Sequence, residues 1–279
     1  MSNISLTASM RSNLLSLQNT QSLMDVTQER LSTGKKVNSA IDNPSSYYTA
    51  QSLNNRASDL SALLDSMGQA IQTIKAADEG IESITAFAQQ AKAVAQSAAD
   101  STDATERSAY LTQFNEILKQ IDAVAADSSY KGINLLGGDT NKLSVKFSEK
   151  AGSTSKLDIT GVNAATKGDG GLGIADATAW SADATGDANI ATAVSQVEAA
   201  ITKLRTWSSE FGNNYSIVQS REEFTENLIN VLTEGADKLT LADMNEESAN
   251  MLALQTRQQL AVNSLSLASQ ASQSVLRLF

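Results

Sequence analysis

Apolar residues recur at alternating intervals of three and four over most of the chain, the pattern of helices that pack lengthwise against other helices. In the first half this spacing joins Leu60, Leu64, Met67, Ile71 and Ile74, and after a change of phase Ile81, Ile84, Ala88, Ala91, Ala95 and Ala98. Asn43 stands at the N-cap position, before the only proline, Pro44, which suits a first helical position because it lacks an N–H. We therefore predict one helix of more than 50 residues that begins at Pro44.

Two more interior segments have the same spacing. The shorter one opens at Asp103, with Glu106 three residues later as in a capping box, and its apolar row is Leu111, Phe114, Leu118, Ile121 and Ala125. The longer one holds heptad spacing from Ile190 to Leu232. At about 1.5 Å per residue it would be on the order of 60 Å long, which favours a bundle of rods over a compact globule.

The composition changes between the helical segments. Nine of the fifteen glycines fall between Gly132 and Gly173. Apolar residues alternate with polar ones at 143–147 and 157–159, and the intervening EKAGSTS supplies turn residues, so we predict a β-hairpin. The next segment, NAATKGDGGLGIADATAWSADATGD, is rich in small and turn-forming residues, and we interpret it as a mobile surface loop.

The two ends of the chain carry very little charge. Residues 1–24 contain one charged residue and residues 248–279 contain two, although both ends have helical spacing. Asp243 with Glu246 forms a second capping box, and Gly34 or Gly235 is where each end could bend away from the rest. The predicted fold is mainly α: long antiparallel helices in a coiled coil or bundle, with a small β-hairpin and a loop inserted in the middle of the chain.

Helices with so little charge are poor candidates for full exposure, so we expect the ends to become buried when many copies assemble. The expected interface residues are Met10, Leu14, Leu17, Gln21, Met24, Leu31, Leu254, Gln255, Val262, Leu265, Val275, Leu276 and Phe279. Polar positions such as Gln21 and Gln255 would permit small sliding between neighbours, and replacing both with Leu should shift the helical form or impair assembly. Heterologous contacts that do not close into a ring would give a helical filament.

The amino-acid composition excludes most classes of enzyme mechanism. The absence of cysteine and histidine excludes thiol nucleophiles, thiolate or imidazole metal sites and every Ser-His or Cys-His arrangement, so we expect no enzyme, no cofactor and no metal. A formal net charge of −10 disfavours nucleic acid and anionic lipid as partners. The N-terminal sequence shows no cleavable export signal, and no segment is apolar enough to span a bilayer.

Four long motifs resemble those of bacterial flagellins, with a middle segment like the short-insert flagellins of alphaproteobacteria. They are SLTASMRSNLLSLQNTQ, QERLSTGKKVNSAIDNPSSYYTAQSLNNR, SSYKGINLLGG and the terminal LADMNEESANMLALQTRQQLAVNSLSLASQASQSVLRLF. The resemblance covers roughly the first 145 and the last 90 residues. It implies a secreted structural subunit of the extracellular flagellar filament, with other copies of itself as its main partner.

The resemblance also implies an arrangement and a set of partners. Residues 1–42 with 236–279 would form the inner layer of the filament, 43–142 with 189–235 the outer layer, and 143–188 a small surface-exposed hairpin and loop. The implied partners are the flagellar type III export apparatus, an export chaperone, the filament cap and the hook-associated proteins.

One departure from the family concerns recognition by the Toll-like receptor of animal innate immunity. Flagellins that this receptor detects carry an Arg-rich, Glu-containing stretch late in the first long helix. Here Gln89 stands where the key arginine should fall and Lys92 where the glutamate should fall. Loss of a guanidinium and reversal of a charge predict weak receptor activation.

Other features of the middle segment have simpler interpretations. GDGGLGIAD differs from a calcium-binding nonapeptide repeat because Asp176 is one position late and there is a single copy. Trp180 and Trp207 could form a sugar-stacking platform, although packing is the simpler role. Flagellins of this style often carry O-linked sugars, and the candidate positions are Ser153, Thr154, Ser155, Thr160, Thr166, Thr178 and Ser181.

Three alternative functions remain open from the sequence. A hook-filament junction protein shares the style of the termini but is present in few copies. A surface module that binds polysaccharide or host tissue would need an aromatic or polar constellation in the middle segment, where only Trp180 is available. An enzyme would have to rest on carboxylates alone.

Overall fold

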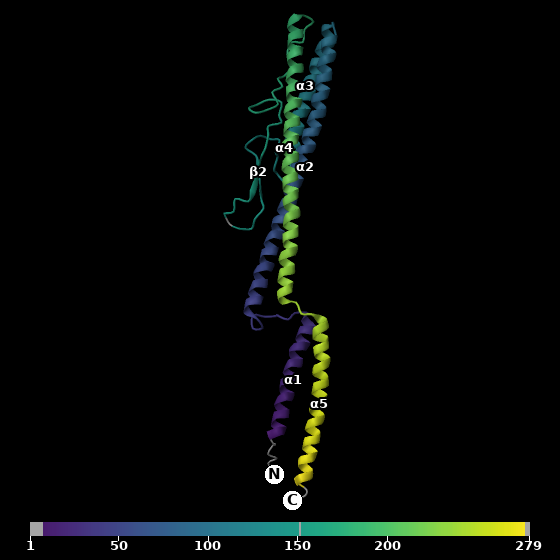
Figure 1. Cartoon of the computed structure of the whole chain (residues 1–279). Coiled ribbons are helices and arrows are strands. Elements are labelled where there is room, and N and C mark those ends of the chain that lie inside the picture. Colours follow the sequence, from purple (N-terminus) through teal and green to yellow (C-terminus); the bar gives the residue numbers. More distant parts are fainter. Residues whose placement is uncertain (1–7, 151, 277–279) are drawn as a thin grey trace. The chain divides into compact units, whose positions relative to one another are not determined.

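The computed structural model describes residues 8–150 and 152–276. In chain order the elements are α1 (Ala8–Thr33), α2 (Pro44–Asp100), α3 (Ala104–Asp127), β1 (Lys142–Lys146), β2 (Lys156–Thr160), α4 (Ala184–Thr240) and α5 (Met244–Leu276) (Figure 1). The chain divides into two compact units. One combines the two ends of the chain, up to Arg56 and from Val231 onward, and the other is Ala57–Asn230. The mainly helical fold class with a small hairpin is confirmed.

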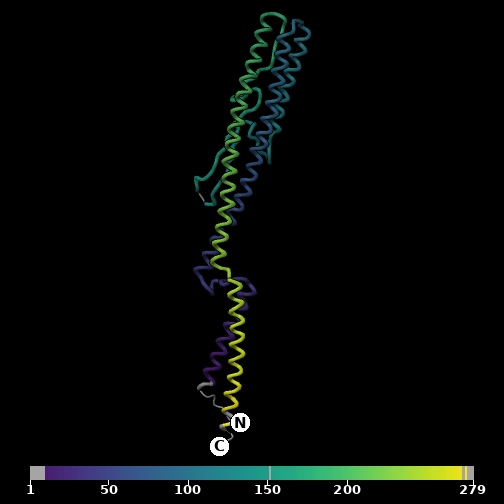
Figure 2. Tube along the Cα trace, turned by 45° about the vertical axis from the view of Figure 1, so that its right-hand side comes forward, coloured from purple at the N-terminus to yellow at the C-terminus, as the bar shows by residue number. Residues whose placement is uncertain are grey.

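The unit formed by the chain ends is built on α1 and α5, which lie side by side and antiparallel in both views (Figures 1 and 2). Beyond α1 the backbone pairs with the segment between α4 and α5. Lys35 and Leu241 form an antiparallel bridge, and the Lys36 and Val37 N–H groups donate to the Thr240 carbonyl at 2.8 and 3.2 Å. These bonds join the two ends of the chain through main-chain atoms, so the junction does not depend on side-chain packing alone.

Glycine marks only one of the two bends that the sequence suggested. Gly34, at φ +71°, ends α1 as a left-handed residue. Gly235 lies inside α4, which continues to Thr240, so the prediction of a bend at Gly235 is wrong. The break falls at 241–243, where the Asp243 carboxylate accepts from the Asn245 and Glu246 N–H groups at 2.9 and 3.3 Å and starts α5.

The other predicted helix starts are confirmed. The Asn43 side-chain oxygen accepts from the Ser46 N–H at 3.1 Å, and α2 runs for 57 residues from Pro44. Asp103 caps α3 by accepting from the Thr105 N–H at 2.7 Å. Glu106 does not complete a reciprocal capping box, because its carboxylate accepts instead from the Ser101 hydroxyl at 2.7 Å.

The core of the larger unit is shared by α2, α3 and α4. The predicted apolar rows point inward: Ile84, Ala88, Ala91, Ala95 and Ala98 of α2, Phe114, Leu118 and Ile121 of α3, and Val197, Leu204, Phe211 and Val218 of α4 are at most 2% exposed. Within this unit the three helices run alongside one another in both views (Figures 1 and 2). Their burial is the main source of stability, since each large apolar side chain contributes about 1.5 to 3 kcal/mol.

The middle of the chain is more buried than its composition suggests. β1 and β2 pair antiparallel with Leu143 opposite Ile159, which confirms the hairpin. The glycine-rich segment after β2 packs onto the helices through its apolar residues, which are Ala164, Leu172, Ile174, Ala177 and Trp180. The Trp180 ring lies 5.2 Å from the Phe114 ring, measured between centroids. The interpretation as a loose loop is therefore wrong to this extent: Leu172, Ile174 and Trp180 are buried against the helices, while Ala175, Ala179 and Ala182 remain exposed at the surface.

Within the described residues, none of the helices combines the length and apolar character needed to cross a membrane.

Candidate assembly surfaces

The contact row between α1 and α5 contains about half of the expected interface residues. On α1 Met10 is buried and Leu17, Met24 and Leu31 are partly buried; on α5 Leu254 and Leu265 are partly buried. Two threonines that the sequence did not single out, Thr20 and Thr27, are buried in the same row at 3% and 6% exposure. The row is thus mainly apolar with two buried threonines, and it pairs the two helices of one chain.

Polar side chains connect the two helices. The Gln258 side-chain amide donates to the Gln21 amide oxygen at 2.8 Å. Arg30 and Glu247 form an ion pair in which the Glu247 side chain is 9% exposed. Gln21 therefore lies at the edge of the row, exposed to solvent but hydrogen-bonded to Gln258 of the other helix.

A second apolar set on the same helices remains exposed. It includes the expected Leu14 and Val262, at 37% and 51%, which therefore do not belong to the contact row within the chain. The sequence analysis missed the other members, which are Leu15, Leu23, Val26, Leu252, Leu260 and Leu267, between 42% and 67% exposed. Adjacent apolar pairs such as Leu14-Leu15 could have revealed them, because neighbouring positions on a helix cannot share one narrow stripe.

Gln255 is exposed and lies outside the contact row. The side chains of Val275 and Leu276, and Phe279 as a whole, lie outside the described residues.

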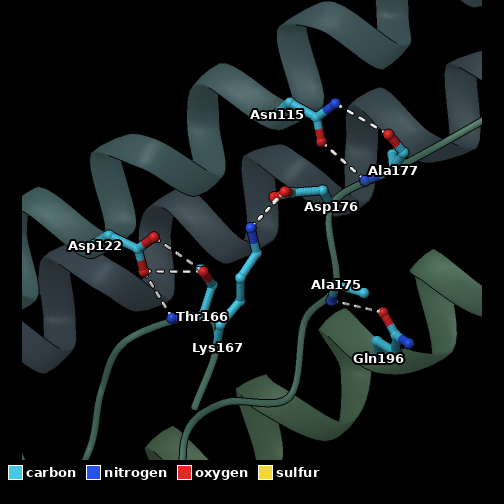
Figure 3. A network of polar contacts seen from close by, with 8 residues as sticks. All are labelled: Asn115, Asp122, Thr166, Lys167, Ala175, Asp176, Ala177 and Gln196. Carbon is cyan, nitrogen blue, oxygen red and sulfur yellow. Dashed lines mark hydrogen bonds and ion pairs between the residues drawn. The ribbon is translucent and has the colours of Figure 1, made fainter.

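In the larger unit, a network of polar contacts fastens the segment after β2 to α3 and α4 (Figure 3). Asp122 of α3 accepts from the Thr166 N–H at 2.7 Å and from its hydroxyl at 2.9 Å. Asn115 forms two hydrogen bonds with the Ala177 backbone, at 2.9 and 3.1 Å. The Gln196 side chain of α4 accepts from the Ala175 N–H at 3.0 Å. The segment is held at several points along its length.

This network decides between the O-glycosylation candidates. Thr166 is completely buried and its hydroxyl is bound by Asp122, so it is removed as a candidate in the folded subunit. Ser153, Thr154, Thr160 and Thr178 are exposed, and Ser155 and Ser181 are partly exposed.

Asp176, Trp180 and Trp207 make contacts within the chain. The Asp176 carboxylate pairs with Lys167 (Figure 3), and the described residues contain no group of three potential metal ligands. Trp180 is buried at 3% exposure, so it offers no ring face for a sugar. Trp207 packs against the core.

The two positions at which the sequence departs from receptor-activating flagellins, Gln89 and Lys92, lie in the larger unit, on α2 beside α4. Gln89 is exposed, and Lys92 forms an ion pair with Glu198 of α4 at 2.8 Å. Both residues line a groove of about 440 Å³ that Gln96 and Arg205 also border. The groove therefore presents the amides of Gln89 and Gln96, the Arg205 guanidinium and a lysine that is neutralised by Glu198.

The comparisons with known proteins agree with this architecture. Residues 4–141 match the bacterial flagellin N-terminal helical region, and residues 194–279 match the bacterial flagellin C-terminal helical region. The chain is 31% identical over 268 residues to flagellin FljK of Caulobacter vibrioides, covering 95% of this chain and 94% of that one. It is also 31% identical to a flagellin of Brucella melitensis, with 95% of both chains covered, and 25% identical to a flagellin of Listeria monocytogenes, with 91% of both covered.

Proposed function

The chain belongs to the bacterial flagellin family and is a structural subunit of the extracellular flagellar filament, and from this premise we propose how its surfaces build the polymer. The α1 and α5 helices pair within each chain through one row of side chains and bind neighbouring copies through the second, exposed row. The observation that carries this proposal is the set of leucines on α1 and α5 that face away from the row in which the two helices meet.

The composition of the two end helices favours their burial between copies. An exposed apolar row is unfavourable in a free subunit, and its burial between copies contributes about 25 cal/mol for each Å² removed from water. Because both chain ends carry few charges, assembly removes few charged groups from water, and the free-energy cost of their desolvation is low. A filament requires heterologous contacts, so we expect the exposed leucines of one copy to meet a different surface of the next copy.

We also propose which residues form each layer of the filament. We assign residues 1–42 and 236–279 to the inner layer, 43–142 and 189–235 to the outer layer, and 143–188 to the outer surface. The pairing of the chain ends supports the first assignment, although in the single chain that unit extends to Arg56 and begins at Val231. In this arrangement the charge-poor helices are the ones that lose contact with solvent.

Export of the subunit to the growing filament would require further protein partners. As a filament subunit, the chain would be exported by the flagellar type III apparatus, held before export by a chaperone, and assembled beneath a filament cap next to hook-associated proteins. The apolar α5 is the natural chaperone target because its leucines are exposed before assembly. We propose a purely structural role without catalysis, and O-linked sugars on the exposed hydroxyls at 153–155, 160, 178 and 181.

Electron microscopy of the purified chain after seeding with flagellar fragments tests the proposal. We expect long filaments from the full chain and none from a chain that lacks residues 236–279. A full chain that stays monomeric and never elongates a seed would overturn the proposal and favour a junction protein or a surface binding module.

A further inference from the structure

The segment between α1 and α2 presents one isoleucine to solvent almost completely. Ile41 is 93% exposed, the highest value among the exposed large apolar residues. A single exposed apolar residue is ordinary on a flexible loop. The backbone around Ile41, however, is held by several hydrogen bonds.

The turn that carries Ile41, residues 38–42, is organised by Asp42. Its Oδ2 accepts from the Asn38 and Ser39 N–H groups at 3.0 and 2.8 Å and from the Ser39 hydroxyl at 3.1 Å. These donors hold the pKa of Asp42 below its usual value, so the carboxylate stays charged and the turn stays closed at neutral pH. The buried Val37 anchors the start of the turn. Ile41 is therefore displayed on a preorganised turn, which lowers the entropic cost of docking.

A shallow hollow that is open to solvent lies on one face of α4. It is lined by Ser216, Ile217, Ser220, Arg221 and Phe224, and its volume is about 440 Å³. Ile217 is 38% exposed and Phe224 is 57% exposed. The Arg221 guanidinium lies 5.4 Å from the centroid of the Phe147 ring, which holds this cation beside the hairpin. The hollow thus offers two apolar side chains with small hydroxyls between them.

The charges of the two surfaces are opposite in sign. Residues 35–42 contain two lysines and one aspartate, a net charge of +1. Residues 216–226 contain one arginine and three glutamates, a net charge of −2. Opposite net charges favour encounter and fix orientation, while the apolar contact supplies the affinity.

We infer that the Ile41 turn of one copy docks into the α4 hollow of a second copy of this chain. The inference rests on the proposed function and identifies one heterologous contact of the polymer. The turn and the hollow are different surfaces, so each copy offers one of each and the contact propagates from copy to copy.

Cross-linking tests the contact directly, because the chain has no cysteine of its own. Filaments are grown from an equal mixture of Ala40→Cys and isotope-labelled Ser220→Cys subunits and treated with a short bis-maleimide. We expect mixed dimers between positions 40 and 220, identified by mass spectrometry. Thr112→Cys, an exposed position on α3, replaces Ser220→Cys in the control and should give none. Filaments without the mixed dimers would overturn the inference and leave the proposed function intact.

Side-chain variants measure how much the contact contributes to the stability of the filament. Ile41→Ala should raise the critical concentration for seeded growth about 10- to 100-fold, while Ile41→Val should change it less than about threefold. The effect of Ile41→Ala should largely disappear in a Phe224→Ala background, since both remove the same contact. Thermal unfolding of the free Ile41→Ala subunit should match the original chain. An unchanged critical concentration would refute this contact alone, whereas a chain that never elongates seeds would refute both the contact and the filament role.

Discussion

Arg30 and Glu247 are 217 positions apart in the sequence, yet Nη1 of the arginine lies 2.9 Å from Oε1 of the glutamate. Arg30 is in the last turn of α1 and Glu247 in the first turn of α5, so each charge also complements the dipole of its own helix. The pair joins the two chain ends next to the bridge between Lys35 and Leu241. It fixes the register from which the rest of the α1 and α5 contact row extends.

Replacement of Glu247 by Gln should loosen this junction. The variant keeps the shape of the side chain but removes a mostly buried charge, and we expect a loss of about 1 to 2 kcal/mol, moderated because Arg30 is partly exposed. Amide hydrogen exchange at the start of α5 measures this loss of local stability. Glu234→Gln breaks the exposed pair with Lys238 and should cost less than about 0.5 kcal/mol. Equal effects of the two variants would contradict the assigned role.

The exposed leucines of α5 should control polymerisation and leave the folded subunit unaffected. Leu252, Leu260 and Leu267 are 62% to 67% exposed, so a triple change to Ser removes little packing within the chain. We expect circular dichroism melting to be unchanged and the critical concentration to rise about 100-fold or more. A matched triple change to Ser at the exposed Thr256, Gln259 and Asn263 should polymerise normally. Normal filaments from the leucine variant would exclude this row as an interface.

Gly80 and Gly212 form a contrasting pair of helical glycines. A Cβ at Gly80 would lie 2.3 Å from the Ser128 hydroxyl and 2.7 Å from Leu136 Cδ1, whereas one at Gly212 would have no neighbour within 4 Å. We expect Gly80→Ala to destabilise the larger unit by about 1 to 3 kcal/mol. Gly212→Ala should stabilise it by about 0.5 to 1 kcal/mol through helix propensity. Urea unfolding measures both, and the same sign for both variants would contradict the packing described here.

The start of α4 should depend on pH through Asp183. The Gly186 N–H donates to this carboxylate at 2.8 Å and the Ser181 hydroxyl at 2.7 Å, and these bonds lower the pKa of Asp183 below its usual 3.8. Its stabilisation is therefore complete above pH 3.8 and is lost as the pH falls through the lower folded-state value. The stability difference between the chain and Asp183→Asn should shrink below about pH 4. A difference that stays constant from pH 6 to pH 2 would rule out this charged cap.

The groove that contains Gln89 and Lys92 predicts weak activation of the Toll-like receptor. Lys92 is already paired with Glu198, and Gln89 offers no cation for a receptor carboxylate. In a reporter-cell titration the chain should be far less potent than a strongly sensed flagellin. The double change Gln89→Arg and Lys92→Glu should increase potency, with Gln96→Arg as a control on the same groove. Equal potency of the original chain and a strongly sensed flagellin would contradict this prediction.

The sequence was sufficient where local chemistry decides structure. Asn43, Asp103 and Asp243 each cap the helix that was expected to follow, because a side-chain oxygen and two or three N–H groups suffice for a cap. The heptad rows of α2, α3 and α4 are buried because their period requires a partner along the whole length.

Long-range contacts decide the features that the sequence did not reveal. The segment after β2 is held by Asp122 and Asn115 of α3, 44 and 62 positions away from their partners, and by Gln196 of the following helix, and none of the three shows a pattern that points to it. The prediction of a bend at Gly235 was wrong for a related reason. The tie between residues 34–37 and 240–242 places the break after Thr240, and helical packing outweighs the weak preference of one glycine.

The alanine row of α2 also affects the width of the subunit. Ala88, Ala91, Ala95 and Ala98 are completely buried, and side chains of one carbon allow neighbouring helix axes to approach toward the lower end of the usual range of about 8 to 10 Å. Each of them contributes less apolar burial than a leucine would. In return neighbouring helices can lie close together at this end, so more rods fit around a cylinder of given radius. Substitution of these alanines with larger residues would widen every subunit by a small amount, and that widening would accumulate over the successive copies in each turn of the helical filament.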